Sequence, residues 1–257
     1  MRQLFLSDVH LGAQPRHLND LLTDQLLRII DYCEINRIKI HILGDLMDYW
    51  MEYPGYTPNL GKKVLDRFNQ FHKTVDPGFF ITGNHDNWTY GYFSEIGFKV
   101  EPEYAVLNLD NREVLMLHGD GLKDPKMDLP RPLFHQLLRG PRFIALYQTL
   151  FDGETGNHLM KTFSEFTRNS TDLEIEKLSK WAQNLLNQQS FDYILAGHDH
   201  VARMETYSDG IYINTGAFYA DGTAAMYNNE RIDLVIWNDE NNQFEPYRSS
   251  INNQAKE

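Results

Sequence analysis

Hydrophobic positions in the first half of the chain alternate between short β-rich runs and longer stretches with helical spacing. Runs typical of strands cover residues 2–8, 38–44 and 79–82, and hydrophobic residues recur at helical spacing through 18–30 and 60–75. Strands that alternate with helices in this way are typical of crossover units, which build a largely parallel sheet. The pattern therefore predicts an α/β fold.

The second half of the chain is richer in strands. Residues 105–109 and 113–117 flank an Asp-Asn pair that is typical of a tight turn, so they predict a β-hairpin. A further strand-rich block covers residues 191–247. The last residues, 249–257, are polar, and we expect them to form a flexible tail.

Between these blocks lies a segment of different composition, at about residues 123–187, whose pattern is helical. It holds nine Lys and Arg against eight Asp and Glu, a formal charge of +1. Since the whole chain has a formal charge of −12, the residues outside this segment carry −13. An extra layer packed on the core and a lid over a site both fit its apolar content. We expect one domain over residues 1–248, with this segment inserted as a helical cap. Its large apolar residues include Leu133, Phe134, Leu137, Phe143, Tyr147 and Phe151.

The composition is that of an ordinary globular protein, with 257 residues, 42% of them hydrophobic and 23% charged. The single cysteine, Cys33, excludes an internal disulfide and a thiolate cluster, which favours a reducing compartment. No stretch approaches the ~20 apolar residues that span a bilayer, and residues 1–6 run directly into a strand without a leader. We expect a cytoplasmic protein whose mature chain begins near Met1.

The acidic balance limits the classes of partner. A formal charge of −12 opposes general binding to phosphate backbones, which argues against a nucleic-acid partner. Carboxylates gathered around divalent cations are locally neutralised, so a smaller anionic substrate remains compatible with this charge. The sequence leaves the oligomeric state open.

Five predicted strands are each followed by candidate metal ligands, and five of the ten histidines fall in these segments. Ligands bind at the carboxyl ends of strands in α/β sheets. Asp and Gly after a strand also form ordinary turns, so one such segment would mean little, but five in this order predict a metal site. The segments are Asp8-Val9-His10, Gly44-Asp45-Leu46-Met47-Asp48, Gly83-Asn84-His85-Asp86, His118-Gly119-Asp120 and Gly197-His198-Asp199-His200.

These residue types suit a pair of divalent cations. Two cations about 3.5–4 Å apart can hold the attacking and leaving oxygens of a phosphoryl transfer, and one can lower the pKa of a bound water. A single Asp carboxylate is suited to bridge them. Imidazole and oxygen ligands without thiolate fit Mn, Fe, Zn or Co better than Ca or Mg alone. We expect two divalent ions, with Mn as the first choice and Fe, Zn or Co as alternatives.

The motifs D-x-H, G-D-x-x-D, G-N-H-D, a later His and G-H-x-H, which span residues 8–200, resemble the motif set of the calcineurin-like metallophosphoesterases. The resemblance implies a four-layer α-β-β-α sandwich of two mixed sheets. It also implies two metal sites that share Asp45 as a bridge. The first site would consist of Asp8, His10, Asp45 and His200, and the second of Asp45, Asn84, His118 and His198.

The same resemblance implies catalytic roles. His85, oriented by Asp48, would stabilise the phosphate or protonate the leaving oxygen, and Asn84 would help to stabilise the charge on the phosphate. The implied reaction is in-line attack on phosphorus by metal-bound hydroxide. For Asp86, Asp120 and Asp199, a role in orienting the ligands and a purely structural role are equally compatible with the sequence.

Within this superfamily, the chain length, the opening L-F-L-S-D-V-H-L, the G-D-L-M-D spacing and the insertion resemble the UDP-2,3-diacylglucosamine diphosphatases of lipid A synthesis. Those enzymes cleave a nucleotide-sugar pyrophosphate that carries two acyl chains, which would explain an apolar insertion and implies peripheral contact with the inner membrane face. They typically have Arg where this chain has His85. A phosphodiesterase or phosphomonoesterase for soluble esters is therefore the alternative, whereas a non-catalytic scaffold would lack metal ligands.

A pyrophosphate also needs cationic partners in the protein. Solvated helix surface is the ordinary alternative for each basic residue near the site in sequence. The candidates for substrate binding are Lys123, Arg131, Arg139 and Arg168.

Overall fold

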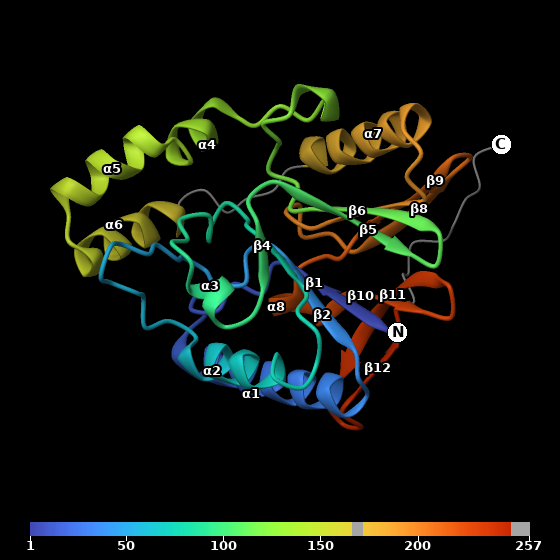
Figure 1. The fold of residues 1–257 in the computed structure, drawn as a ribbon, viewed down its shortest axis with the longest axis horizontal. Coiled ribbons are helices and arrows are strands. Elements are labelled where there is room, and N and C mark those ends of the chain that lie inside the picture. Colours follow the sequence, from blue (N-terminus) through green and yellow to red (C-terminus); the bar gives the residue numbers. More distant parts are fainter. Residues whose placement is uncertain (166–171, 248–257) are drawn as a thin grey trace.

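Two β-sheets pack face to face in the computed structural model, which describes residues 1–165 and 172–247 (Figure 1). The seven-stranded sheet mixes parallel and antiparallel pairs, and its strand order is β12-β11-β10-β1-β2-β3-β4. Its neighbouring strands β1, β2, β3 and β4 are parallel, as the crossover pattern predicts. The strands are β1 (Gln3–Leu6), β2 (Lys39–Leu43), β3 (Phe79–Ile81), β4 (Lys99–Glu101), β10 (Thr223–Asn228), β11 (Arg231–Asn238) and β12 (Gln243–Pro246).

The five-stranded sheet is also mixed, with the order β5-β6-β7-β9-β8. The predicted hairpin is confirmed, because β5 and β6 pair antiparallel from Tyr104 opposite Leu117 to Leu109 opposite Arg112. The strands are β5 (Tyr104–Leu109), β6 (Arg112–Leu117), β7 (Tyr193–Ala196), β8 (Arg203–Tyr207) and β9 (Gly210–Asn214).

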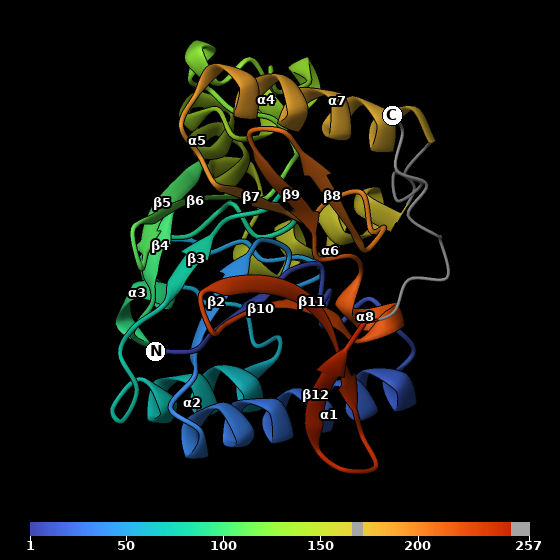
Figure 2. The same ribbon diagram turned by 90° about the vertical axis from the view of Figure 1, so that its right-hand side faces the viewer.

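Helices cover the outer face of each sheet, which gives the predicted four layers (Figure 2). Successive residues of a strand point to opposite faces. Phe5 of β1 therefore packs between the sheets with Met116, while Leu4 faces the helices α1 (Arg16–Ile35) and α2 (Lys62–Phe71). Both helices lie within the regions of helical periodicity or extend them by a few residues. Short elements without such periodicity were not predicted, namely α3 (Tyr92–Glu95), β4 and α8 (Phe218–Asp221).

The helical insertion divides into two parts with different positions. Its last helix, α7 (Asp172–Gln188), packs on the five-stranded sheet through Leu178, Trp181 and Leu185, so it forms the outer layer there. The preceding helices extend beyond the edge of the sandwich (Figure 1), and we call them the cap helices. They are α4 (Leu133–Leu138), α5 (Pro141–Leu150) and α6 (Gly153–Glu165), and a 3-10 turn, η1 (Pro125–Met127), precedes them.

The cap helices are joined to the sandwich by an aromatic cluster. Phe143 and Tyr147 of α5 pack against Tyr53 and Trp88, which lie in the loops after β2 and β3. The indole N–H of Trp88 also donates a hydrogen bond of 2.9 Å to the carbonyl of Leu138. None of the helices in the described part of the chain combines the length and the apolar content that a membrane span requires. The predicted tail, residues 249–257, lies outside the described residues.

Candidate metal centre

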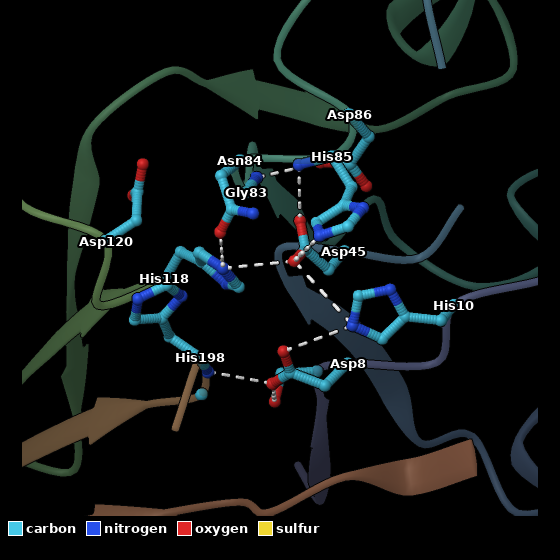
Figure 3. Close-up of polar contacts among 12 residues, drawn as sticks. Asp8, His10, Asp45, Gly83, Asn84, His85, Asp86, His118, Asp120 and His198 are labelled. Carbon is cyan, nitrogen blue, oxygen red and sulfur yellow. Dashed lines mark hydrogen bonds and ion pairs between the residues drawn. The ribbon is translucent and has the colours of Figure 1, made fainter. Parts of the chain in front are cut away.

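The loops that follow β1, β2, β3, β6 and β7 meet at one edge of the sandwich (Figure 3). The loops after β1 and β2 remain paired beyond the strands, because the N–H of Val9 donates to the carbonyl of Asp45 at 2.9 Å. The two sheets are joined there as well. The His198 N–H donates to Asp8 Oδ2 at 2.9 Å, and the His118 ring bonds to the carbonyl of Leu43 at 2.9 Å.

Five of the predicted metal ligands have a left-handed backbone. This conformation costs a residue other than glycine about 1–3 kcal/mol, and it persists only where surrounding contacts impose it. Its repetition at one edge of the fold shows that the loops are held in an unfavourable shape in order to bring these side chains together. The φ values are 50° for Asp8, 47° for His10, 54° for Asp45, 74° for His198 and 62° for His200.

Asp8, His10 and His200 form the first group of closely spaced ligand atoms. Nε2 of His200 lies 3.4 Å from Nε2 of His10 and 3.2 Å from Oδ1 of Asp8. Ligand atoms around one ion with metal–ligand distances near 2.1 Å lie roughly 3–3.5 Å apart, so this spacing fits a single cation. Oδ1 of Asp8 is buried and accepts no hydrogen bond from the described residues, as expected of an atom that binds an ion.

The charges of this group are mutually stabilising. Burial opposes ionisation of Asp8, but the imidazoles of His10 and His200 outweigh it and lower the pKa of that carboxyl well below its usual range. Burial lowers the pKa of His10, whereas Asp48 and Asp8 raise it more strongly, to about 9. A cation bound here would displace the proton from His10.

Asp45 lies at the centre of the site. Its Oδ1 accepts a hydrogen bond of 2.9 Å from the N–H of His85. Its Oδ2 faces three imidazoles, at 3.3 Å from His118 Nε2, 3.8 Å from His10 Nε2 and 3.9 Å from His85 Nε2. Asp45 also belongs to two of the groups that could hold an ion, one with His10 and one with His118. This position between both groups is the one that a bridging carboxylate needs.

Glycine at position 83 allows the loop after β3 to approach Asp45. A Cβ on Gly83 would lie 1.9 Å from Oδ1 of Asp45, which no side chain could tolerate without a shift. The approach brings Asn84 to the second part of the site, where its Oδ1 lies 3.1 Å from Nε2 of His118.

His118 has the ring orientation that a metal ligand requires. Because its Nδ1 faces a carbonyl, that of Leu43, Nδ1 must carry a proton, and Nε2 is the nitrogen that points toward Asp45 and Asn84. Burial lowers the pKa of His118, but Asp45 outweighs it and raises the pKa to about 10. With the protein alone Nε2 therefore holds a proton, which a divalent cation would replace.

His198 lies at the outer side of this second part. Its ring centroid is 5.1 Å from that of His118, and burial lowers the pKa of His198 to about 4, so its ring is neutral at physiological pH. His198 is not part of the closely spaced groups found among the described residues. The first part of the site is thus more tightly assembled than the second.

His85 is oriented by the main chain of Asp48. Its Nδ1 lies 2.5 Å from the Asp48 carbonyl, whereas the Asp48 carboxylate is 3.9 Å from Nδ1 of His85 and 3.7 Å from Nδ1 of His10. The Asp48 carboxylate is therefore shared by two histidines, and the Nε2 of His85 faces the centre. Burial lowers the pKa of His85.

The three aspartates whose roles the sequence leaves open are all buried and bonded. Asp86 accepts hydrogen bonds from the N–H groups of Gly83 at 2.7 Å and Leu46 at 2.9 Å, so it ties the loop after β3 to the loop after β2. Asp199 pairs with Arg203 at 2.7 Å, and Asp120 pairs with Arg139 at 2.9 Å. Burial raises the pKa of Asp120, but Arg139 and other cations outweigh it, and the net shift is downward.

Two contacts with the predicted ligands were not anticipated. Ser7 and Thr215 form a hydroxyl pair of 2.6 Å behind Asp8, and Ser7 bonds to the Asp8 carboxylate. The ring of Tyr219 on α8 lies edge-on to His10 and His200, at 5.6 Å and 5.8 Å between ring centroids. Ser7 could have been found as the neighbour of Asp8, but no sequence pattern marks Thr215 or Tyr219 because both reach the site from far along the chain.

A sequence model of the calcineurin-like phosphoesterases matches residues 1–202, most of the chain. The protein belongs to this family. The phosphoesterase is 27% identical over 245 residues to UDP-2,3-diacylglucosamine hydrolase from Shewanella sp. (strain W3-18-1). The alignment covers 91% of this chain and 96% of the relative. It is 24% identical over 246 residues to the hydrolase of that name from Proteus mirabilis (strain HI4320), covering 91% and 98% of the two chains.

Among solved structures, Yfce, a phosphoesterase from E. coli, aligns with 95% of this phosphoesterase and 96% of its own chain, at 16% identity and a TM-score of 0.48.

The His and Asp groups of the phosphoesterase are consistent with a dinuclear metal site.

Three of the cations predicted to bind substrate line one cavity of the phosphoesterase. This cavity has a volume of about 590 Å³ and lies between the loop after β6 and the cap helices, and its lining includes Lys123, Arg131 and Arg139. Arg131 is already paired with Glu103 at 3.0 Å, and Arg139 with Asp120. Lys123 is exposed. Arg168 lies outside the described residues.

Proposed function

We propose that this phosphoesterase hydrolyses an acylated nucleotide-sugar pyrophosphate of the UDP-2,3-diacylglucosamine kind, using two divalent cations. The observation that carries the proposal is the apolar surface of the cap helices. Six of the 13 large apolar side chains that are exposed in the described part of the chain lie on these helices, each between 44% and 83% exposed, and such a concentration is typical of an interaction surface. They are Leu133, Phe134, Leu137, Leu146, Leu150 and Leu159.

Acyl chains could cover this surface. Burial of a leucine side chain contributes about 1.5–3 kcal/mol, so a few of these residues could supply much of the affinity for a lipid. The near-neutral insertion in a chain of charge −12 also reduces repulsion from an anionic membrane surface. Peripheral contact with the membrane through the cap helices is part of the proposal, and the names of the two relatives support the substrate class.

The chemistry follows from the arrangement of the residues. When bound, two divalent cations neutralise charge on the phosphoryl oxygens and lower the pKa of water. Asp8, His10, Asp45 and His200 would hold one cation, while Asp45, Asn84, His118 and His198 would hold the other. Asp45, which belongs to both sets, would hold both cations. Nε2 of His85 faces the same centre, where in its protonated form it would stabilise the phosphate or, for a leaving group that needs a proton, protonate the leaving oxygen.

His85→Gln should separate substrates by their leaving group. We expect kcat to fall about 10²-fold for a substrate with an alkyl-type leaving oxygen, the lower end of the usual contribution of a general acid. For a p-nitrophenyl ester the fall should stay below about 10-fold, because p-nitrophenolate leaves without a proton. Steady-state kinetics on both substrates measure the ratio, with the exposed His17→Gln as control. Equal losses on both substrates would remove the acid role.

The second candidate is a phosphodiesterase or phosphomonoesterase for soluble esters. It is favoured by His85, since the acylglucosamine enzymes that this sequence resembles typically have Arg there. In that case the apolar surface of the cap helices would have another partner, and acylation of a substrate would bring no advantage.

Hydrolysis of UDP-2,3-diacylglucosamine with Mn²⁺, beside bis(p-nitrophenyl) phosphate, tests the two candidates. Asp45→Ala and a chelator provide the inactive references. We expect selective, metal-dependent release of UMP. Cleavage of the generic ester alone would reject the lipid substrate and favour the second candidate.

Variants of the cap helices sharpen this test. Leu146→Ser should raise KM for the acylated substrate about 10-fold and leave KM for the soluble ester unchanged, because it removes apolar contact with acyl chains only. The matched control is Leu21→Ser on α1, since Leu21 and Leu146 are similarly exposed, at 63% and 59%. If Leu146→Ser had the same KM as the wild type for the acylated substrate, acyl contact at this position would be rejected.

A further inference from the structure

Arg139, the residue directly after helix α4, reaches from the cap helices to the candidate metal centre. Its Nη2 donates to the carbonyl of Gly83 at 2.8 Å and to Oδ2 of Asp120 at 2.9 Å, and its Nη1 donates to the carbonyl of Pro102 at 3.1 Å. The side chain is 11% exposed. A long side chain held by three separate segments of the core is more than a surface ion pair.

The two groups nearest to this guanidinium belong to the loops that carry the second part of the metal centre. Gly83 directly precedes Asn84, and Asp120 follows His118 by two residues. Asn84 and His118 face each other at 3.1 Å between Oδ1 and Nε2. One guanidinium therefore spans the loop after β3 and the loop after β6, and it can set the distance between these two side chains.

We propose that Arg139 is a positioning residue that holds Asn84 and His118 in the geometry that binds the second cation, and that it couples this geometry to the cap helices. The inference rests on the dinuclear centre of the proposed function. The first group, Asp8, His10 and His200, makes no hydrogen bond or ion pair with Arg139 among the described residues. Loss of Arg139 should therefore affect the two cations unequally.

Other basic residues near Asp120 cannot take over this role. Arg131 approaches Asp120 only to 3.5 Å, and its guanidinium is engaged by Glu103 at 3.0 and 3.1 Å. His135 lies 3.8 Å from the same carboxylate. Of these three, only Arg139 also bonds to the carbonyl of Gly83.

The planar fork of arginine is important for this contact. Its five donors can satisfy a carboxylate and several carbonyls at once, whereas a lysine ammonium is a compact charge with fewer donors in a different geometry. Arg139→Lys preserves the charge next to Asp120 but should not bridge both loops as well. The lysine variant thus separates positioning from simple charge neutralisation.

The test is a titration of the metal-free full-length protein with Mn²⁺. Calorimetry measures the affinity of each site, and electron paramagnetic resonance detects the bound Mn²⁺. We expect two sites in the wild type, with a spin-coupled Mn²⁺ pair at saturation. Arg139→Gln should keep the first site and weaken the second about 10- to 100-fold, the usual effect of removing a group that orients a metal ligand. The resonance signal of the spin-coupled Mn²⁺ pair should decrease accordingly. The affinity of the second site in Arg139→Lys should lie between those of the wild type and Arg139→Gln.

Arg142→Gln is the matched control, because Arg142 is an exposed arginine three residues further along the same cap. It should bind both cations as the wild type does. If Arg139→Gln does not fold, Arg139→Lys replaces it in the same titration. Wild-type affinity at both sites in the Arg139 variants would overturn the inference, as would equal weakening of both sites. A wild type that binds a single Mn²⁺ would instead reject the dinuclear centre itself.

Discussion

We expect Asp45→Asn to lower the rate of phosphoester hydrolysis by at least about 10³-fold, while the protein remains folded. Removal of one preorganised donor from an active site already costs about 10²–10³-fold, and Asp45 is expected to serve both cations. Its Oδ2 lies between His118 and His10, at 3.3 and 3.8 Å. The amide that replaces this oxygen is neutral and cannot bridge two cations. The measurement is kcat with saturating Mn²⁺.

The isosteric amide makes the loss specific to metal binding. The amide oxygen can still accept the hydrogen bond that the His85 N–H gives to Oδ1, so the loop contact is kept. Asp76→Asn is the control, since Asp76 is 73% exposed and outside the site, and it should retain full activity. Metal analysis of both proteins should show less than two Mn²⁺ per chain only for Asp45→Asn. Wild-type turnover of Asp45→Asn would mean that another group bridges the cations.

Much of the architecture could be predicted because it depends on local patterns. Strands that alternate with helices give a parallel sheet whose strand ends share one edge, so residues after β1, β2 and β3 must be neighbours. His118 and His198 join them because β6 and β7 pair in parallel and because the two sheets pack face to face. The positions of the candidate metal ligands therefore follow from their place at strand ends.

The partners of long polar side chains could not be predicted in this way. The sequence marks Arg131 and Arg139 as cations available to a substrate, yet each is paired with a carboxylate that lies about 20 residues or more away in the chain, Glu103 and Asp120 respectively. The partner of His85 could not be predicted either. Its Nδ1 lies against the main-chain carbonyl of Asp48, and every residue has such a carbonyl, so the residue type gives no signal. Side-chain contacts of this kind depend on the packed fold.

The arrangement of the helices predicted over residues 123–187 could not be read from the sequence. Helix α7 has an apolar face like that of the cap helices, but it packs on the five-stranded sheet through Trp181 and Leu185. Periodicity shows that a helix has a face to bury, and it does not show which surface will cover that face. The division between outer layer and cap helices comes from the tertiary structure.

Removal of divalent metal should abolish hydrolysis and reduce thermal stability. The buried carboxylates of Asp8 and Asp45 are the groups that cations would neutralise at the centre. A cation present at 100 times its dissociation constant stabilises the folded state by about 2.7 kcal/mol. For a chain of this size that corresponds to a fall of roughly 5–10 °C in Tm when a chelator removes it. Activity assays and thermal unfolding with and without chelator measure both effects.

Protons compete with the cations for the same atoms, which gives this prediction a direction in pH. The pKa values of His10 and His118 are raised, to about 9 and about 10, so both rings carry an extra proton when the site holds no metal at neutral pH. Mn²⁺ binding should release these protons, and its apparent affinity should increase as the pH rises toward those values. Buffers of different ionisation enthalpy reveal the released protons in calorimetry. Binding without proton release would mean that the cation does not replace the protons on His10 and His118, and the assignment of these residues as ligands would then be wrong.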